Sequence, residues 1–272
     1  YFSILALGQI GGKEIRATDN HPFLSFNGWA EMKSLKPGDR IAAPRSVPAG
    51  TAAWPRHEAA LLGWVLSEGN TCHPSGFYVY STDPAQADDM VRSAEAFENT
   101  GTTVRVRRGL HEIYVRSADF SSISGARHWL GSLGLIDKRA TEKFIPDPVF
   151  GLDQSGLATF LGRLWSGDGF VFLDGNRVPY YATSSPRLAQ DLQHLLLKLG
   201  IVSRVTKKEF NNRGGFKTGY TVHLLTRESI QAFADVIGPE LIGKAKALAA
   251  LREYLKGLTE DRMSSDTVPI EA

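Results

Sequence analysis

Hydrophobic and polar residues alternate in two different ways along this chain of 272 residues. In residues 1–50, short apolar stretches have the two-residue period of strands, and turns such as GQIGG, Asn-Gly and Pro-Gly separate them. From about residue 57 onward, apolar residues recur at helical spacing, and helices alternate with pairs of strands. The pattern predicts a β-rich module at 1–50, a linker at 51–56 and an α+β region at 57–272.

The α+β region shows the same order of elements twice. In residues 57–135 the pattern predicts a helix, two strands, a helix, two strands and a helix, and the order recurs in residues 152–240. The middle helices begin alike, because Asp83-Pro84 and Ser185-Pro186 each place an N-cap residue before a proline in the first turn. We therefore expect two αββαββα units related by a pseudo-two-fold axis.

Each unit opens with an apolar helix that ends on an acid and a glycine. The segments are LLGWVLSEG and FLGRLWSGDG, and their acids, Glu68 and Asp168, are 100 residues apart (168 − 68). Small residues recur every four positions, on one helix face, at Ala59, Gly63 and Ser67 and at Ala158, Gly162 and Ser166. We expect these faces to pack on the axis, with the two carboxylates within about 7 Å of each other, a separation that shared Mg²⁺ coordination permits.

Two converging carboxylates repel each other unless a cation lies between them. One acid after an apolar helix is usually a solvated helix end, but two acids in matched motifs favour a shared site. Mg²⁺ binds one or two carboxylates and keeps waters and phosphate oxygens as its other ligands. The pair therefore predicts a Mg²⁺ site suited to phosphodiester hydrolysis by metal-activated water.

These segments resemble the two motifs of the LAGLIDADG homing endonucleases. KFIPDPVF, ahead of the second motif, and LLLKLGIVSRV, after it, are similar to further blocks of that family. The resemblance implies that Glu68 and Asp168 are catalytic metal ligands and that Lys143 is an accessory base or electrostatic partner. Two departures stand out: the first motif ends in Glu rather than Asp, and Arg163 replaces the packing glycine of the second. Either the helix crossing is adjusted or the site is partly decayed.

The first fifty residues resemble part of the intein splicing domain, the all-β Hint fold. The similarity lies in IRATDNHPF, with its Thr-x-x-His block, and in LKPGDRIAAPR. It implies that His21 polarises a scissile peptide and that Thr18 hydrogen-bonds nearby. The sequence of this segment is most similar to that of inteins in bacterial replicative DNA helicases. The chain begins at Tyr1 and ends at Ala272, so we expect a piece of a longer precursor, with host-protein exteins, that does not splice alone.

Basic residues occupy alternate positions on strands of both units. Because alternate side chains share one face of a strand, a polar face is expected on each sheet. A solvated sheet face is the simpler interpretation of one such strand, but twin basic faces beside twin acids favour a surface laid along duplex DNA. The candidate DNA-binding residues are Arg105, Arg107, Arg116, Arg204, Lys208, Lys217 and His223.

Composition narrows the remaining classes. The net charge is +2, hydrophobic residues make up 42% of the chain, and Cys72 is the single cysteine, so an internal disulfide is excluded and a reducing, cytoplasmic compartment is expected. No apolar run approaches the ~20 residues that span a membrane. We expect a monomeric endonuclease within a self-splicing intein, acting on the intein-less host gene. A decayed, DNA-binding or structural insert is the alternative, and an RNA-splicing maturase is a more remote one.

Overall fold

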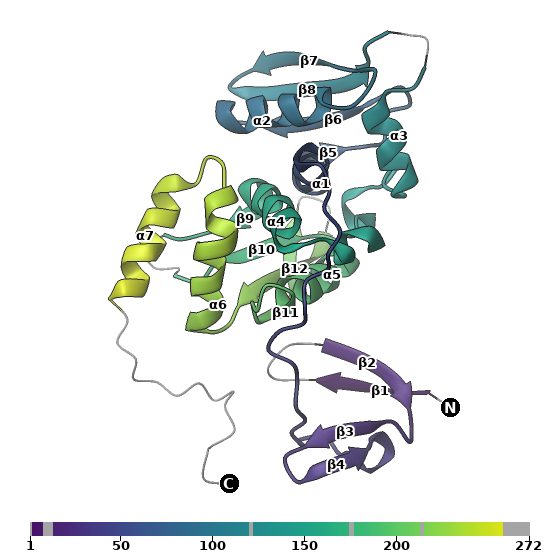
Figure 1. Cartoon of the computed structure of the whole chain (residues 1–272), viewed down its shortest axis with the longest axis vertical. Helices are drawn as coiled ribbons and strands as arrows, with labels where there is room; N and C mark the ends of the chain where they lie inside the picture. The colour runs from purple at the N-terminus through teal and green to yellow at the C-terminus, as the bar shows by residue number, and fades with distance from the viewer. Residues whose placement is uncertain (1, 8–12, 120–121, 174–176, 213–214, 258–272) are drawn as a thin grey trace.

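The structure, a computed structural model, describes residues 2–7, 13–119, 122–173, 177–212 and 215–257. A small β-rich module at the N-terminal end is joined by an extended segment to two α+β units (Figure 1). The two units lie on either side of a central pair of helices, α1 and α4 (Figure 1). No helix among the described residues is long and apolar enough to cross a membrane.

The N-terminal module consists of two antiparallel strand pairs. Strand β1 (Phe2–Leu7) pairs with β2 (Lys13–Thr18), and β3 (Pro22–Ser25) pairs with β4 (Gly28–Glu31), followed by a 3₁₀ turn, η1 (Met32–Ser34). Gly28 has a φ of 103°, a left-handed conformation that glycine adopts without steric cost, so the Asn27-Gly28 dipeptide closes the second hairpin as expected. The turn expected at residues 8–12 lies outside the described residues.

The segment expected to be a linker is bound to the second unit. Ala52 pairs with Leu152 as a parallel bridge: its N–H donates to the Gly151 carbonyl, and its carbonyl accepts from the Asp153 N–H, both at 2.9 Å. Gly50 packs directly against the backbone of Gly151, where no Cβ would fit. Backbone pairing of this kind fixes the path of the chain, so residues 50–53 do not behave as a free tether.

The two α+β units have the same topology. The first contains α1 (Arg56–Glu68), β5 (Gly69–Asn70), β6 (Phe77–Ser81), α2 (Pro84–Glu95), β7 (Thr100–Arg107), β8 (Leu110–Ser117) and α3 (Gly125–Ser132). The second contains α4 (Gln154–Asp168), β9 (Gly169–Phe170), β10 (Tyr180–Thr183), α5 (Pro186–Leu197), β11 (Ser203–Asn212), β12 (Gly215–Leu224) and α6 (Arg227–Ala232). The sheets run in the orders β5-β6-β8-β7 and β9-β10-β12-β11, so the predicted internal repeat is confirmed.

Local sequence explains where the middle helices begin. The Asp83 carboxylate accepts hydrogen bonds from the backbone N–H groups of Ala85 and Gln86, and the Ser185 hydroxyl accepts from that of Leu188. These bonds satisfy N–H groups that have no partner inside the helix. The matched caps expected from the Asp-Pro and Ser-Pro pairs are therefore present.

Two parts of the second unit differ from expectation. Of the strand expected over GFVFLD, the described residues form a continuous strand only at Gly169–Phe170, as β9. After α6 the chain continues through a π-helix, η4 (Phe233–Ile237), and a 3₁₀ turn, η5 (Gly238–Glu240), into an additional helix, α7 (Ala245–Lys256). Helix α7 joins the core through Leu248, Leu251 and Leu255, at helical spacing. Between the units, the KFIP segment, residues 143–146, lies between two 3₁₀ turns, η2 (Ala140–Glu142) and η3 (Asp147–Gly151).

Candidate active site

Helices α1 and α4 pack against each other at backbone distance. A Cβ built on Gly63 would lie 2.6 Å from the Phe160 carbonyl oxygen and 2.7 Å from the Arg163 Cβ, so only glycine fits at this crossing. Nearer the C-terminal ends, a Cβ on Gly167 would lie 2.7 Å from the Ser67 Cβ. The expected contact between the two helices is confirmed, and residues 100 apart, such as Ser67 and Gly167, face each other across it.

The small-residue face assigned to the second helix is wrong. Gly162 packs against Glu240 rather than against α1, and the Ser166 hydroxyl accepts a hydrogen bond from the Ile242 N–H at 2.8 Å. The stripe on α4 therefore makes room for residues 240–242. The small residues of the two helices are 99 positions apart in the sequence, whereas the two acids are 100 apart. The α1–α4 contact pairs residues that are 100 apart, so it follows the spacing of the acids and not that of the small residues.

Each central helix turns directly into a strand at its acidic residue. The Gly69 N–H donates to the Val65 carbonyl, and the Gly169 N–H donates to the Trp165 carbonyl, which closes the last turn of each helix. Both glycines pack so closely on that turn that a Cβ would overlap it. Since α1 and α4 lie side by side in the same register, the two acids, Glu68 and Asp168, come to the same end of the helix pair.

Burial and mutual repulsion shape the electrostatics of the two acids. Burial raises the pKa of the Glu68 carboxyl, and the nearby Asp168 charge raises it further, while Lys143 and Lys244 lower it. Burial also raises the pKa of Asp168, against the opposing effects of Lys143, Lys244 and the Tyr181 hydroxyl. Glu68 is half-buried and Asp168 is exposed, so both carboxylates are within reach of a cation, and a bound cation would relieve their repulsion.

Lys143 is buried at the C-terminal end of α1. Its side chain is 8% exposed, and its ammonium donates to the carbonyls of Val65 and Leu66 at 3.0 Å and of Gly69 at 2.9 Å. These carbonyls lie at the C-terminal end of α1, where helix carbonyls are least satisfied, so the lysine caps the negative end of the helix dipole. Burial lowers the pKa of Lys143 to about 8, although Asp168 and Glu68 oppose that effect.

The segment that carries Lys143 is held by the other unit. The Ser185 hydroxyl donates to the Lys143 carbonyl at 2.6 Å, and the Ile145 N–H donates to the Asp191 carboxylate at 3.0 Å. Ser185 and Asp191 belong to the start and the middle of α5. Lys143 therefore spans the two units, with its backbone fixed by unit two and its side chain on α1 of unit one.

Lys244 is the counterpart of Lys143, and sequence reasoning missed it. Its ammonium donates to the carbonyls of Gly167 and Gly169 at the end of α4, and burial lowers its pKa against the effect of Asp168 and Glu68. The two lysines are 101 residues apart (244 − 143), close to the offset of the acids. The spacing of the two lysines was the sequence feature that could have revealed Lys244. The residues around them differ, because Lys244 follows Ile-Gly whereas Lys143 precedes Phe-Ile-Pro.

The low pKa of Lys143 predicts a pH dependence of stability. The unfolded chain holds this proton with a pKa near 10.5, whereas the folded protein releases it near 8, so stability should rise with pH between these values. From pH 8 to pH 10 the rise attributable to Lys143 should be about 2 kcal/mol. Urea unfolding of wild type and Lys143→Met at both pH values measures it as the difference between the two proteins. An equal pH dependence in both would contradict the shifted pKa.

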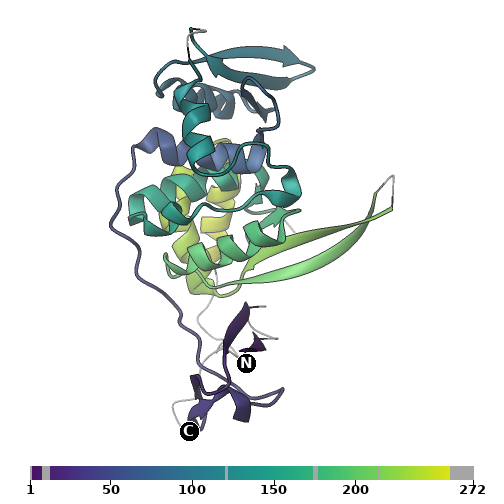
Figure 2. The ribbon, with the colours of Figure 1, turned by 90° about the vertical axis from the view of Figure 1, so that its right-hand side faces the viewer.

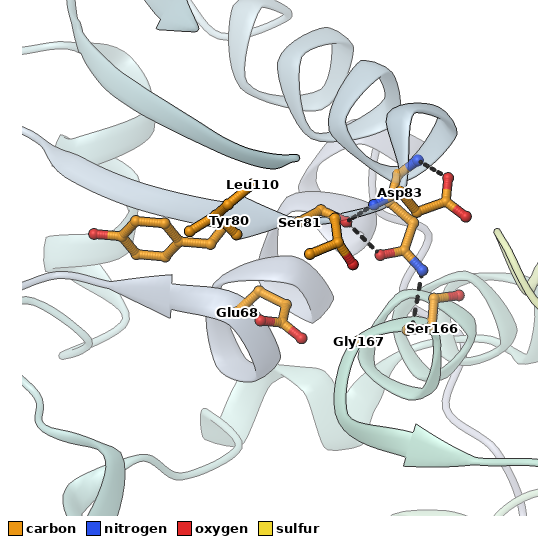
Figure 3. Close-up of a pocket in the computed structure, with 9 residues that line it drawn as sticks. Glu68, Tyr80, Ser81, Asp83, Leu110, Ser166 and Gly167 are labelled. Atoms are coloured by element: carbon orange, nitrogen blue, oxygen red, sulfur yellow. Dashed lines mark hydrogen bonds between the residues drawn. The ribbon is translucent and has the colours of Figure 1, made fainter. Parts of the chain in front are cut away.

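Two cavities flank the acids, one in each unit. Glu68 lines a cavity of about 340 Å³ together with Tyr80, Ser81 and Gln86 of unit one, and with Ser166 and Gly167 of α4 (Figure 3). Gln86 closes one wall, because its side-chain amide donates to the Ser166 carbonyl at 3.0 Å. Asp168 and Lys143 line a second cavity of about 520 Å³, which extends along β10 and β12. Each acid thus opens toward the sheet of its own unit.

The predicted basic residues of unit one share a sheet face. In β8, Ile113 and Val115 are fully buried against the helices, so Arg116 points to the opposite face. Register places Arg105 opposite Glu112, and Arg107 lies two residues further along the same face. Tyr78, Tyr80 and Tyr114 lie on that face too, with the Tyr78 and Tyr114 rings stacked at 4.7 Å.

The predicted basic residues of unit two also share a face, and it adjoins the acids. Arg204 lies opposite His223 in the β11–β12 ladder, and Lys208 lies on the same face. Burial lowers the pKa of His223, and the positive charges of Lys208 and Arg204 lower it further, so the three groups form one basic cluster. Lys208 and His223 line the same cavity as Asp168. Lys217 lies further out on the β11–β12 ribbon, which projects beyond the helices (Figure 2).

Thr18 and His21 lie together in the N-terminal module, apart from the acids. The His21 N–H donates to the Thr18 carbonyl at 2.9 Å in the turn between β2 and β3. Both side chains are exposed, and the His21 ring makes an edge contact with Phe23. The expectation that these two residues lie outside the α/β repeat is met, and their role in splicing remains a prediction.

The donor set at the helix ends fits a hard cation that keeps part of its own shell. Among the described residues there is no cluster of three or more His, Cys, Asp or Glu side chains, so the protein offers two carboxylates and nearby main-chain carbonyls. Mg²⁺ is bound in this way, since it retains several waters and takes one or two carboxylates. In addition, the Tyr181 hydroxyl is fully buried near Asp168 without a hydrogen-bond partner.

Comparisons with known proteins show similarity to one family and to parts of two larger proteins. Residues 155–238 match the family described as LAGLIDADG-like domain. The chain is 34% identical, over 95% of its length, to the replicative DNA helicase DnaB of Rhodothermus marinus, and 29% identical, over 84%, to the replication factor C small subunit of Thermococcus kodakarensis. It spans 28% and 25% of these relatives, about a quarter of their length.

A solved structure of the homing endonuclease I-DmoI in complex with DNA and Mn aligns with 67% of this chain and 96% of its own, at 12% identity and a TM-score of 0.46.

Proposed function

Because this chain carries a LAGLIDADG-like domain that resembles part of replicative DNA helicases, we propose that it is a site-specific endonuclease cutting duplex DNA with a divalent metal. The observation that carries the proposal is the pair of acids at the ends of α1 and α4, each flanked by a lysine that caps its helix. Two acids and two lysine ammonium groups, placed symmetrically, match the two strands of a duplex. Cleavage of both strands requires attack on one phosphate in each.

The residues of the chain divide the chemistry among them. Glu68 and Asp168 would hold Mg²⁺, which supplies positive charge at the phosphate and lowers the pKa of a bound water. Lys143 and Lys244 place two further positive charges beside the acids, where negative charge develops on the attacked phosphate. The basic sheet faces bind the flanking phosphates and orient the duplex, and their side chains reach into the groove for sequence.

The comparisons support an inserted element as the setting of this nuclease. A replicative DNA helicase and a replication factor C small subunit are different proteins, yet most of this chain resembles about a quarter of each. The helicase alignment covers 95% of the chain and therefore includes most of residues 1–50. We propose that residues 1–50 belong to the protein-splicing domain of an intein, with Thr18 and His21 in its splicing site and the host protein as exteins.

The direct test is cleavage by the full-length intein with Mg²⁺. A plasmid carrying an uninterrupted replicative helicase gene from the source organism should be linearised, and the same gene interrupted by the intein should resist. Chelation of the metal should stop the reaction. Binding of the uninterrupted gene without cleavage would favour the alternative, a decayed DNA-binding insert. Glu68 in place of Asp keeps that alternative open, whereas Arg163 no longer supports it, because its guanidinium is fully engaged in ion pairs.

The two lysines at the helix ends should contribute to cleavage rather than to binding. We expect Lys143→Ala and Lys244→Ala each to slow cleavage by about 10- to 100-fold, because each removes a cation near the developing charge. DNA affinity should change by less than about 3-fold, since phosphate contacts on the sheets supply most of it. Lys246 is an exposed lysine on α7, so Lys246→Ala is the matched control, and this variant should cleave DNA normally. Normal cleavage by both Lys143→Ala and Lys244→Ala would show that the lysines only cap the helices and do not take part in cleavage.

A further inference from the structure

A buried hydroxyl lies beside one of the two acids. Tyr181, on β10, is 0% exposed, and its ring packs against Trp165 with 5.6 Å between centroids. Its main chain pairs with Gly169, the residue after Asp168. Among the described residues, only the Tyr181 and Ser203 hydroxyls are buried side-chain polar atoms without a hydrogen-bond partner. A buried hydroxyl without a partner is unfavourable, so its presence at the acid site calls for a function.

The Tyr181 hydroxyl and the Asp168 carboxylate influence each other. The hydroxyl lowers the pKa of Asp168, while burial and the charges of Asp168 and Glu68 raise that of Tyr181. The two groups nevertheless do not form a direct hydrogen bond in this structure.

The other acid lacks this neighbour. In unit one, the residue paired with the glycine after the acid is Val79, opposite Gly69, just as Tyr181 is opposite Gly169. Val79 is fully buried and cannot donate a hydrogen bond. The acid on this side is Glu68, which has one more rotatable bond than Asp168. The two halves of the pseudo-symmetric site therefore differ. In one, the shorter Asp168 has the buried hydroxyl of Tyr181 beside it, and in the other, the longer Glu68 has the apolar Val79 at the equivalent position.

We propose that Tyr181 is a positioning residue for Asp168. When the acids hold a divalent cation, the hydroxyl donates a hydrogen bond to the carboxylate oxygen of Asp168 that does not face the cation. This bond fixes the rotamer of Asp168, as partners of metal-binding carboxylates do, so the Asp168 position binds the cation more tightly than the Glu68 position. The inference rests on the proposed function, because it assumes that the acids bind a divalent cation.

The experiment is a titration of the full chain with Mn²⁺, without DNA, followed by the electron paramagnetic resonance signal of the free ion. Tyr181→Phe should weaken Mn²⁺ binding by about 10-fold. In the absence of metal its thermal unfolding midpoint should be equal to or above that of wild type, because the change removes a buried hydroxyl without a partner. A loss of affinity together with retained stability is a combination that a purely structural role does not produce.

Three further variants separate the possible outcomes. Ser203→Ala removes the other buried hydroxyl without a partner and should leave Mn²⁺ affinity unchanged, whereas an equal loss in this variant would overturn the proposal. Asp168→Asn should weaken binding more than Glu68→Gln. If Asp168→Asn weakens binding but Tyr181→Phe does not, the role of Tyr181 is refuted and the proposed function stands. If neither acid variant changes the affinity, the proposed function fails as well.

Discussion

Replacing Asp168 with asparagine should abolish cleavage of the target duplex while DNA binding persists. The substitution keeps the shape of the side chain but removes the charge that would hold a divalent cation at the end of α4. We expect the cleavage rate to fall by more than about 10³-fold, equivalent to roughly 4 kcal/mol of transition-state stabilisation. DNA affinity should stay within about 3-fold of wild type, because the contacts that supply it lie on the sheet faces. Strand-specific nicking and gel-shift titrations measure the two quantities.

The matched control is Asp88→Asn. Asp88 is exposed on α2, and its replacement removes the same unit of charge from the chain away from the acids. This variant should cleave and bind as wild type does. Unaltered cleavage by Asp168→Asn would remove the catalytic assignment and favour a scaffold function. A comparable loss in both variants would instead show that overall charge, and not the acid at the helix end, controls the reaction.

Local patterns were sufficient to predict the elements that position the acids. Both central helices end at the expected residues, because an apolar stretch that meets an acid and a glycine can be read within ten residues of chain. The internal repeat was readable for a similar reason: the order of elements and the Asp-Pro and Ser-Pro caps recur. Lys143, which the family resemblance singled out ahead of Ile-Pro, is buried at the end of α1, and its function is still a prediction.

What the sequence did not reveal depends on contacts between distant segments. Lys244 reaches the end of α4 only because residues 240–242 pack into the stripe of Gly162 and Ser166, and periodicity does not show which segment fills a groove. For the same reason the stripe was assigned to the wrong neighbour. Tyr181 looked like an ordinary strand residue, since its place beside Asp168 depends on the register of β10 with β9.

Arg163 shows most clearly how a long-range contact changes an interpretation. In the sequence it is a charge on an apolar helix where a glycine was expected, which suggested decay. In the structure its guanidinium is buried and forms ion pairs at 2.8 Å with Asp89 of α2 and with Glu240 of η5. Trp64 of α1 also donates to Asp89 at 2.8 Å. The arginine therefore ties together both units and the segment that leads to Lys244.

The ionisation of Asp89 and Glu240, the two acids that pair with Arg163, reflects these hydrogen bonds. Burial alone would raise the pKa of Asp89, but hydrogen bonds from Arg163 and Trp64 outweigh it, and the pKa is lowered. Burial also opposes ionisation of Glu240, and hydrogen bonds from Arg56 and then Arg163 reverse that effect. Removing Arg163 would therefore leave Asp89 as a buried charge with reduced compensation.

Arg163→Met should accordingly lower the free energy of unfolding by about 3 kcal/mol, because breaking a buried ion pair from one side leaves the other charge desolvated. The control is Arg92→Met. Arg92 pairs with the same carboxylate at 3.5 Å but is 69% exposed, so its loss should change the free energy of unfolding by less than about 1 kcal/mol. Urea denaturation followed by circular dichroism measures both values. If the two variants lost the same stability, burial would not be what makes the Arg163 pair strong, and the arginine would be a tolerated irregularity rather than the residue that joins the two units.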